Sequence, residues 1–309
     1  MKRLNRLIAL ALALLAFAAL PAMAETTITG TAAAETVAAS DAEAVTLMDQ
    51  YTATTDMTRL DLGSVKATDL QRLEAFLDKF PKLERVDMFA TPLRNSQVEE
   101  LAARYPDVKF GWTVQIAEHT FRTDQTAFST LHYGGAKTHN NKMFTALRFC
   151  TELRALDLGH NGFNDLSFLY EMPELRVLII ACNHFTDLTP IASLKKLEYL
   201  EIFSNDITDI SPLAGLPNLM DLNIGYNKIT DYSPLFELPS LKRLWMYKSN
   251  AYGVAAPVDE LQAAYPDCLI NNVSNPSEGG WRQHPHFDVI HAMFRANVYQ
   301  PFEDSFTDE

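Results

Sequence analysis

The most regular feature of the chain is a hydrophobic pattern that repeats every 22 residues across 151–238. Each unit opens with apolar residues spaced as L-x-x-L-x-L/I, and a fifth unit begins with Leu241, Leu244 and Met246 in the same columns. Alternate side chains in such a segment lie on one face of a short strand. Because one unit is too small to bury that face alone, we predict that successive units stack and bury it between them.

A polar column follows the strand in every unit. Its asparagines are predicted to form a ladder, because an amide side chain can satisfy backbone groups that the turn would otherwise leave unpaired inside the stack. Three of the four units then carry a Ser/Thr-Pro pair, which cannot continue a regular helix. The return path is therefore predicted to be a tight turn or a short 3₁₀ segment. The ladder residues are Asn161, Asn183, Asn205 and Asn227.

The full motif, L-x-x-L-x-L/I-x-x-N followed by I/F-T/N-D-L/I-S/T-P, resembles the leucine-rich repeat family, and in particular its 22-residue, internalin-like subclass. The strict match covers 151–238, and looser units extend it to about 57–270. The resemblance implies an α/β leucine-rich-repeat solenoid: a horseshoe with a parallel β-sheet on its concave face and short helices and 3₁₀ turns on its convex face. It also implies an exported bacterial binding protein, without identifying the ligand.

The units on the N-terminal side, within 45–109, are irregular. Two apolar segments, 57–65 and 82–90, have the spacing of repeat strands, but their matching positions are 26 residues apart. Val65 and Thr91 stand where the asparagine is expected. We therefore predict two repeat strands in this half without the regular asparagine ladder.

Helices are predicted to follow these two segments, with capping boxes opened by Thr68 and by Ser96. Residues 110–135 then alternate apolar and polar side chains without the repeat pattern, which predicts a hairpin-like insert. The regular array occupies 136–270 and ends in a closing helix and strand. The chain is thus divided into irregular units, an insert and a regular array.

The first 24 residues have the composition of a signal peptide. A basic start is followed by an apolar run too short for a comfortable membrane span, then by Pro21 and a small-x-small triplet at 22–24. We predict cleavage before Glu25, a flexible lead-in over 25–44, and a secreted protein or one of the extracytoplasmic envelope. No later apolar run is long enough to form an integral membrane segment.

The C-terminal tail or cap is predicted over 271–309. Phe287, Ile290, Phe294 and Val298 recur at helical spacing, which predicts a short amphipathic helix. Three placements are open for this helix. It caps the apolar edge of the last unit, as solenoids require, it docks a partner, or it covers the concave face.

Side chains between the core positions of each strand are predicted to point out of the concave face. In the C-terminal strands they form a group of aromatic rings with carboxylates among them, which suits peptides, basic side chains and sugar rings. The alternative is that the C-terminal tail covers these rings. The predicted ligand-binding residues are Tyr199, Glu201, Phe203, Asp221, Asn223, Tyr226, Arg243, Trp245 and Tyr247.

The net charge and the cysteines exclude further classes of function. The net charge is −13 and becomes −16 without the signal segment, which carries Lys2, Arg3 and Arg6 and no acidic residue. Such a surface disfavours nucleic acid. The three cysteines fit neither a complete disulfide framework nor a metal motif.

The sequence contains no convincing catalytic or metal-binding motif. The chain has no G-x-S-x-G, no H-E-x-x-H and no Gly-rich phosphate loop, so we predict no enzyme activity, no catalytic residue and no cofactor. His284, His286 and His291 lack a carboxylate or cysteine at metal-binding spacing, so no metal is predicted. The sequence favours a binding scaffold that recognises a protein or peptide. A cell-wall or glycan-binding accessory protein and a structural envelope protein are the alternatives, and the oligomeric state is left open.

Overall fold

The computed structural model describes residues 42–131 and 139–306. The predicted signal peptide and nearly all of the predicted lead-in lie outside the described residues. The described chain begins with an antiparallel hairpin of β1 (Ala44–Leu47) and β2 (Tyr51–Thr54). None of its helices is both long and apolar enough to cross a membrane.

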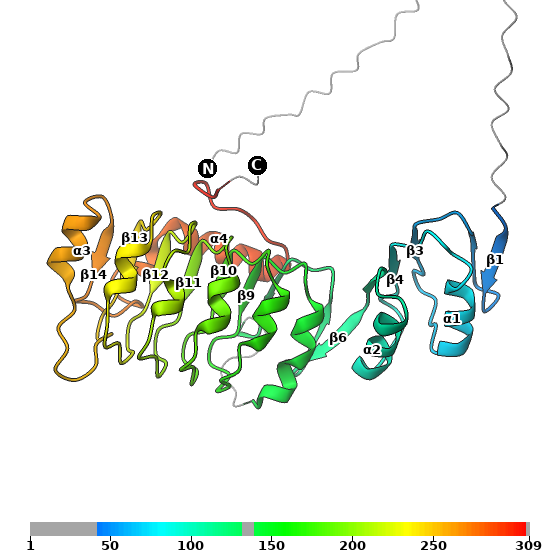
Figure 1. The fold of residues 1–309 in the computed structure, drawn as a ribbon, viewed down its shortest axis with the longest axis horizontal. Coiled ribbons are helices and arrows are strands. Elements are labelled where there is room, and N and C mark those ends of the chain that lie inside the picture. Colours follow the sequence, from blue (N-terminus) through cyan, green and yellow to red (C-terminus); the bar gives the residue numbers. More distant parts are fainter. Residues whose placement is uncertain (1–41, 132–138, 307–309) are drawn as a thin grey trace, which may run out of the picture. The chain divides into compact units, whose positions relative to one another are not determined.

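A seven-stranded parallel sheet takes one strand from each repeat unit, in sequence order (Figure 1). The core leucines of neighbouring strands are directly in register, with Leu156 beside Leu178, Leu178 beside Leu200 and Leu200 beside Leu222. The strands are β8 (Ala127–Ser129), β9 (Ala155–Asp157), β10 (Val177–Ile179), β11 (Tyr199–Glu201), β12 (Asp221–Asn223), β13 (Arg243–Trp245) and β14 (Leu269–Asn271).

The return path of each regular unit contains a 3₁₀ helix, and these helices stack on one another in the same order as the strands. Proline stands in the first turn of η4, η5 and η6, where its missing N–H is not needed and its fixed φ is compatible with the helix. The predicted α/β repeat solenoid is confirmed. The helices are η2 (Asn141–Phe149), η3 (Ser167–Glu171), η4 (Thr189–Ser193), η5 (Ser211–Leu213) and η6 (Ser233–Glu237).

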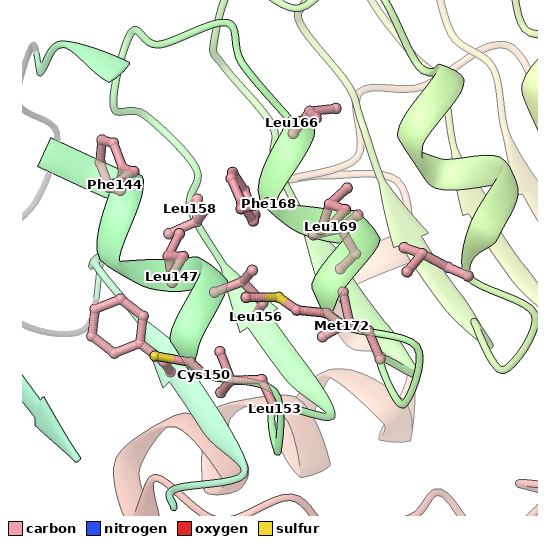
Figure 2. Close-up of a cluster of buried hydrophobic side chains, with 14 of the residues drawn as sticks. Phe144, Leu147, Cys150, Leu153, Leu156, Leu158, Leu166, Phe168, Leu169 and Met172 are labelled. Carbon is pink, nitrogen blue, oxygen red and sulfur yellow. The ribbon is translucent and has the colours of Figure 1, made fainter. Parts of the chain in front are cut away.

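Adjacent units share a hydrophobic core between the strands and the 3₁₀ helices. Figure 2 shows side chains of η2, η3 and the β9 segment pointing toward one another in this core. Full burial of each large apolar side chain contributes roughly 1.5–3 kcal/mol, so the interlocking of units is a major stabilising term. The labelled residues are Phe144, Leu147, Cys150, Leu153, Leu156, Leu158, Leu166, Phe168, Leu169 and Met172, and all are buried.

The asparagine column binds each unit to the one before it. The Asn205 Nδ2 donates to the carbonyls of Ile180 and Ile202, at 3.0 Å each, and its Oδ1 accepts from the Phe185 N–H at 3.1 Å. The Asn183 Nδ2 bonds the carbonyls of Leu158 and Ile180 in the same way, at 2.9 and 3.1 Å. Each buried amide therefore satisfies backbone groups of two successive units.

The irregular N-terminal units form a separate three-stranded parallel sheet of β3 (Arg59–Asp61), β4 (Arg85–Asp87) and β5 (Lys109–Gly111). Here Thr91 takes over part of the role of the asparagine. Its hydroxyl donates to the Val65 carbonyl at 3.1 Å and accepts from the Ala67 N–H at 3.2 Å.

The two helices of this region begin one or two residues away from the predicted capping boxes. For α1 (Leu70–Leu77) the cap is Asp69, whose carboxylate accepts from the Arg72 N–H at 3.2 Å. For α2 (Asn95–Arg104) the Gln97 side chain accepts from the Arg94 N–H at 3.1 Å. The predicted caps at Thr68 and Ser96 were wrong because Asp69 is a better placed acceptor and because Ser96 already lies inside the first turn.

The segment predicted as an insert contains two kinds of structure. β6 (Thr113–Ile116) and β7 (His119–Arg122) form an antiparallel hairpin. The following residues, Ala127–Ser129, belong instead to the seven-stranded sheet as β8, with Phe128 in register with Leu156. Phe128 precedes its partner Leu156 by 28 residues and not by 22, so the 22-residue pattern does not reveal this strand.

At the other end, α3 (Val258–Ala264) and β14 close the array, and the C-terminal tail, residues 272–306, runs back over the sheet. The tail contains η7 (Trp281–Gln283) and α4 (Pro285–Ala296). It covers the outer face, meaning the face whose side chains point away from the core leucines (Figure 1). Within the tail, α4 packs against β8. Of the three predicted placements, the structure has the third.

One residue of the predicted amphipathic face is not part of it. Val298 lies beyond the last helical residue, after Asn297 in the left-handed conformation, and is 52% exposed. The apolar residues of α4 that are buried against the sheet are Ile290, Met293 and Phe294.

Candidate functional site

The outer face of the sheet and the tail form a second hydrophobic core. The Trp281 ring packs between Tyr199 and Trp245, with ring centroids 5.3 and 5.9 Å apart, and Phe302 lies 6.2 Å from Tyr199. Val177 and the apolar residues of α4 belong to the same cluster. An uncovered face with these residues would be a large apolar patch, which a tail of matching character removes from water.

Because the tail covers this face, most of the predicted ligand-binding residues are buried. Six of the nine lie within strands, on the outer face as alternation predicts, whereas Phe203, Tyr226 and Tyr247 follow the ends of their strands. The tail supplies its own apolar face and excludes solvent from the middle of the sheet. The expectation that these side chains are open to a ligand was wrong for six of the nine. The six buried residues are Tyr199, Glu201, Asp221, Asn223, Arg243 and Trp245.

The tail provides hydrogen-bond partners for several buried polar groups of this face. The Glu201 Oε2 accepts from the Tyr199 hydroxyl at 2.9 Å and from the Trp281 Nε1 at 3.1 Å. The Trp245 Nε1 donates to the Ser274 carbonyl at 3.0 Å. These groups therefore serve to hold the tail on the sheet.

Asp221 is the centre of a buried ionic cluster. Arg243 donates to both of its oxygens, at 2.6 Å each, and the His286 Nδ1 lies 2.5 Å from its Oδ2. The other ring nitrogen of His286 lies 2.9 Å from an oxygen of Asp304, which also pairs with Lys242. Burial alone would raise the pKa of Asp221, but the bonds from His286 and Arg243 hold that pKa below its usual value.

His286 is thus engaged by two carboxylates, one from the sheet and one from the tail. Within the described ranges, no three histidine, cysteine or acidic side chains gather as they would around a metal ion.

A second buried ion pair ties the end of the tail to the sheet. Arg176 pairs with Glu198 and also donates to the Phe306 carbonyl at 2.9 Å, while the Ser305 hydroxyl donates to Glu198 at 2.6 Å. Sequence reasoning missed both pairs. The signal was present, because Arg176 and Glu198, like Asp221 and Arg243, carry opposite charges at the same repeat position in adjacent units.

Three predicted residues remain partly exposed beside the tail: Phe203, Tyr226 and Tyr247, here called the aromatic edge. The rings of Tyr226 and Tyr247 meet edge to face, with centroids 5.4 Å apart, and the ammonium of Lys248 lies 5.2 Å from the Tyr247 ring. The Tyr226 hydroxyl accepts from the tail residue Asn275 at 3.2 Å. The aromatic edge therefore combines two contacting rings with a nearby cation and is partly exposed to solvent.

A cavity of about 310 Å³ lies between the outer face and the tail. Asp157 lines it, and its two oxygens accept from the Ser129 hydroxyl at 2.8 Å and from the Gly159 N–H at 3.0 Å. Burial raises the pKa of Asp157 to about 6 despite these bonds. Glu201 and Arg282 also line the cavity, together with apolar side chains of β10 and α4.

Comparison with known proteins agrees with the repeat pattern. The sequence matches models of leucine-rich repeats at residues 149–166 and 195–235. No curated protein matches the chain. Many solved structures are similar to it, including the following three. An internalin (InlF) from Listeria monocytogenes is 21% identical, with a TM-score of 0.42 over 72% of this chain and 75% of that one. Internalin C2 from the same organism is 27% identical, with a TM-score of 0.35 over 62% and 71%. A leucine-rich repeat protein of Leptospira interrogans is 19% identical, with a TM-score of 0.38 over 64% and 44%.

Proposed function

We propose that this leucine-rich-repeat chain is a non-catalytic, extracytoplasmic scaffold that binds a protein or a peptide. The observation that carries the proposal is the aromatic edge, where Tyr226 and Tyr247 are held in fixed orientation and remain partly exposed. Tyrosine is among the residues that dominate binding energy at interfaces. A sheet whose strands are locked by the asparagine column loses little conformational entropy on binding.

The extracytoplasmic location is supported by the sequence at 1–24, with its basic start, apolar run and small-x-small triplet. An acidic surface and a lone cation at Lys248 beside two rings favour a ligand that presents both apolar and charged groups. Binding through the edge leaves the tail in place and requires no displacement of the buried outer face.

A second candidate function is recognition of a cell-wall glycan. It is favoured by the same two tyrosines, because sugar rings stack on aromatic faces. A structural role in the envelope would need neither ring.

The test is a double substitution, Tyr226→Ala with Tyr247→Ala, assayed against a displayed peptide library and a glycan array. The matched control replaces Tyr170 and Tyr252, two exposed tyrosines away from the edge, by alanine. We expect the edge variant to lose roughly thirtyfold or more in affinity, since the loss of even one interface hot spot costs ~2 kcal/mol or more, and the control to lose nothing. Selection of peptides by the parent chain and not by the edge variant supports the first function. Selective loss on the glycan array supports the second, and equal binding by all three chains contradicts both.

A further inference from the structure

We propose that the cavity beneath the tail binds an organic cation, a primary ammonium on a short apolar stem, presented either by a free amine or by a lysine side chain. The cavity shares none of its lining with the aromatic edge, so it is a second site on the chain. Its apolar walls, its two carboxylates and Arg282 determine which class of ligand the cavity can bind.

The walls suit a short apolar stem. Ile179 of β10 faces Phe287, Ile290 and Phe294 of the tail across the cavity. Its volume of about 310 Å³ lies at the lower end of the ~300–1,000 Å³ range of ligand pockets. A stem of a few carbons would contact apolar side chains of both the sheet and the tail.

The charged groups select a cation. Glu201 is 2% exposed, and its Oε2 is fully engaged by Tyr199 and Trp281. Its Oε1 lies 3.9 Å from Arg282, beyond hydrogen-bonding distance, and accepts no hydrogen bond from the described residues. Asp157 is a second buried carboxylate on the same wall, and burial raises its pKa because the charged form is poorly solvated. An ammonium between the two carboxylates would supply the donors that this wall is missing.

Arg282 is the competitor of such a ligand. Its side chain is 37% exposed at the rim of the cavity, and its Nε is buried without a hydrogen-bond partner in the described part of the chain. The guanidinium thus approaches Glu201 without forming a good pair. A bound ammonium would be repelled by this charge, so removal of the charge should strengthen binding.

The experiment is a titration of the full chain at pH 7, followed by ligand-observed NMR, with isoamylamine and with its neutral isostere isoamyl alcohol. A blocked Ala-Lys-Ala tripeptide is the third probe. We expect isoamylamine to bind roughly tenfold more tightly than the alcohol, because a charge-assisted hydrogen bond is lost in the latter. Binding of the tripeptide as well identifies a lysine side chain as the natural form of the ligand, and binding of the amine alone identifies a free amine.

Three variants test the residues. Asp157→Asn should weaken amine binding about tenfold, whereas Arg282→Gln should tighten it. Asp288→Asn, which removes an exposed carboxylate of α4 outside the cavity, changes the net charge as Asp157→Asn does and should leave the affinity unchanged. A merely structural role of Asp157 and Arg282 would not move the two affinities in opposite directions.

The pH profile provides a readout that does not depend on any variant. Amine binding should tighten from pH 5 to pH 7 as Asp157 loses its proton, while the amine stays charged. The other charged or titratable groups that line the cavity are Glu201, Arg282 and His291, and His160 interacts electrostatically with Glu201 and Arg282. If Asp157→Asn fails to fold, Arg282→Gln and the pH profile decide the question. Equal affinity for amine and alcohol, or weaker amine binding by Arg282→Gln, overturns the assignment.

Discussion

The asparagine column permits a quantitative prediction at Asn205. Replacement by alanine removes three buried hydrogen bonds, but the three backbone groups that lose a bond are not equally affected. The carbonyl of Ile180 keeps a bond from Asn183, and the carbonyl of Ile202 keeps one from Asn227. The N–H of Phe185 has no second acceptor among the described residues and becomes an unpaired buried donor.

The expected loss of unfolding free energy follows from the hydrogen bonds that are lost and those that are kept. An orphaned buried N–H costs about 1–3 kcal/mol, and the two weakened carbonyls add about 1 kcal/mol together. Asn205→Ala should therefore lower the free energy of unfolding by about 2–4 kcal/mol, measured by urea denaturation and far-UV circular dichroism. The matched control is Asn218→Ala, since the Asn218 amide bonds the Lys195 carbonyl at an exposed position. That substitution should change stability by less than ~0.5 kcal/mol.

The result that refutes this reasoning is a loss below about 1 kcal/mol for Asn205→Ala with an unchanged dependence on urea. Such a result would mean that the Phe185 N–H is rescued by water or that the column is open to solvent in solution.

Three further predictions concern the tail and the charges beneath it. Trp281→Ala should lower the free energy of unfolding by about 3–5 kcal/mol, because it opens a gap between the tail and the outer face. The gap should also bind a hydrophobic dye, and unchanged dye fluorescence would contradict the packing of Trp281 against the sheet. Since the folded-state pKa of Asp157 is raised from 3.8 to about 6, its ionisation opposes folding above pH 6 and the penalty disappears as pH falls toward 4. Asp157→Asn should therefore be more stable than the parent at pH 8 by up to ~3 kcal/mol and equal to it near pH 4 in thermal melts. Asp221→Asn should lower stability at pH 7 by about 3–5 kcal/mol, because Arg243 and His286 lose a buried counter-charge; a loss under 1 kcal/mol in urea titrations would show that the cluster is solvated.

The sequence was sufficient for the features that recur. The leucine columns predict the strands β9 to β13, and three Ser/Thr-Pro pairs predict 3₁₀ return paths, because each unit meets the same neighbours as the next. The pattern was insufficient where a unit departs from it. Phe128 of β8 precedes its partner Leu156 by 28 residues, and Thr91 replaces the asparagine while keeping part of its hydrogen bonding.

The tail could not be placed from the sequence because its partners are distant along the chain. Helical spacing identifies an apolar face on α4, but it does not say whether that face meets the edge of the last unit or the middle of the sheet. The buried pairs Arg176–Glu198 and Asp221–Arg243 held the missing information. Asp221 and Arg243 lie on neighbouring strands, and Arg176 and Glu198 directly precede β10 and β11. Opposite charges at the same position of adjacent units allow an ion pair that offsets the cost of burying both charges.

The tail also changes how the stack of repeats should come apart. In a simple solenoid each unit contacts only its neighbours, so the terminal units can unfold independently. Here the Tyr299 N–H donates to the Thr126 hydroxyl at 2.8 Å, across 173 residues, and so joins the tail to the residue just before β8, the first strand of the seven-stranded sheet. A stack in which each unit contacts only its neighbours thereby acquires contacts between residues that are far apart in the sequence. Unfolding of the seven units should be a single cooperative event, and during synthesis the outer face must stay uncovered until the tail has emerged.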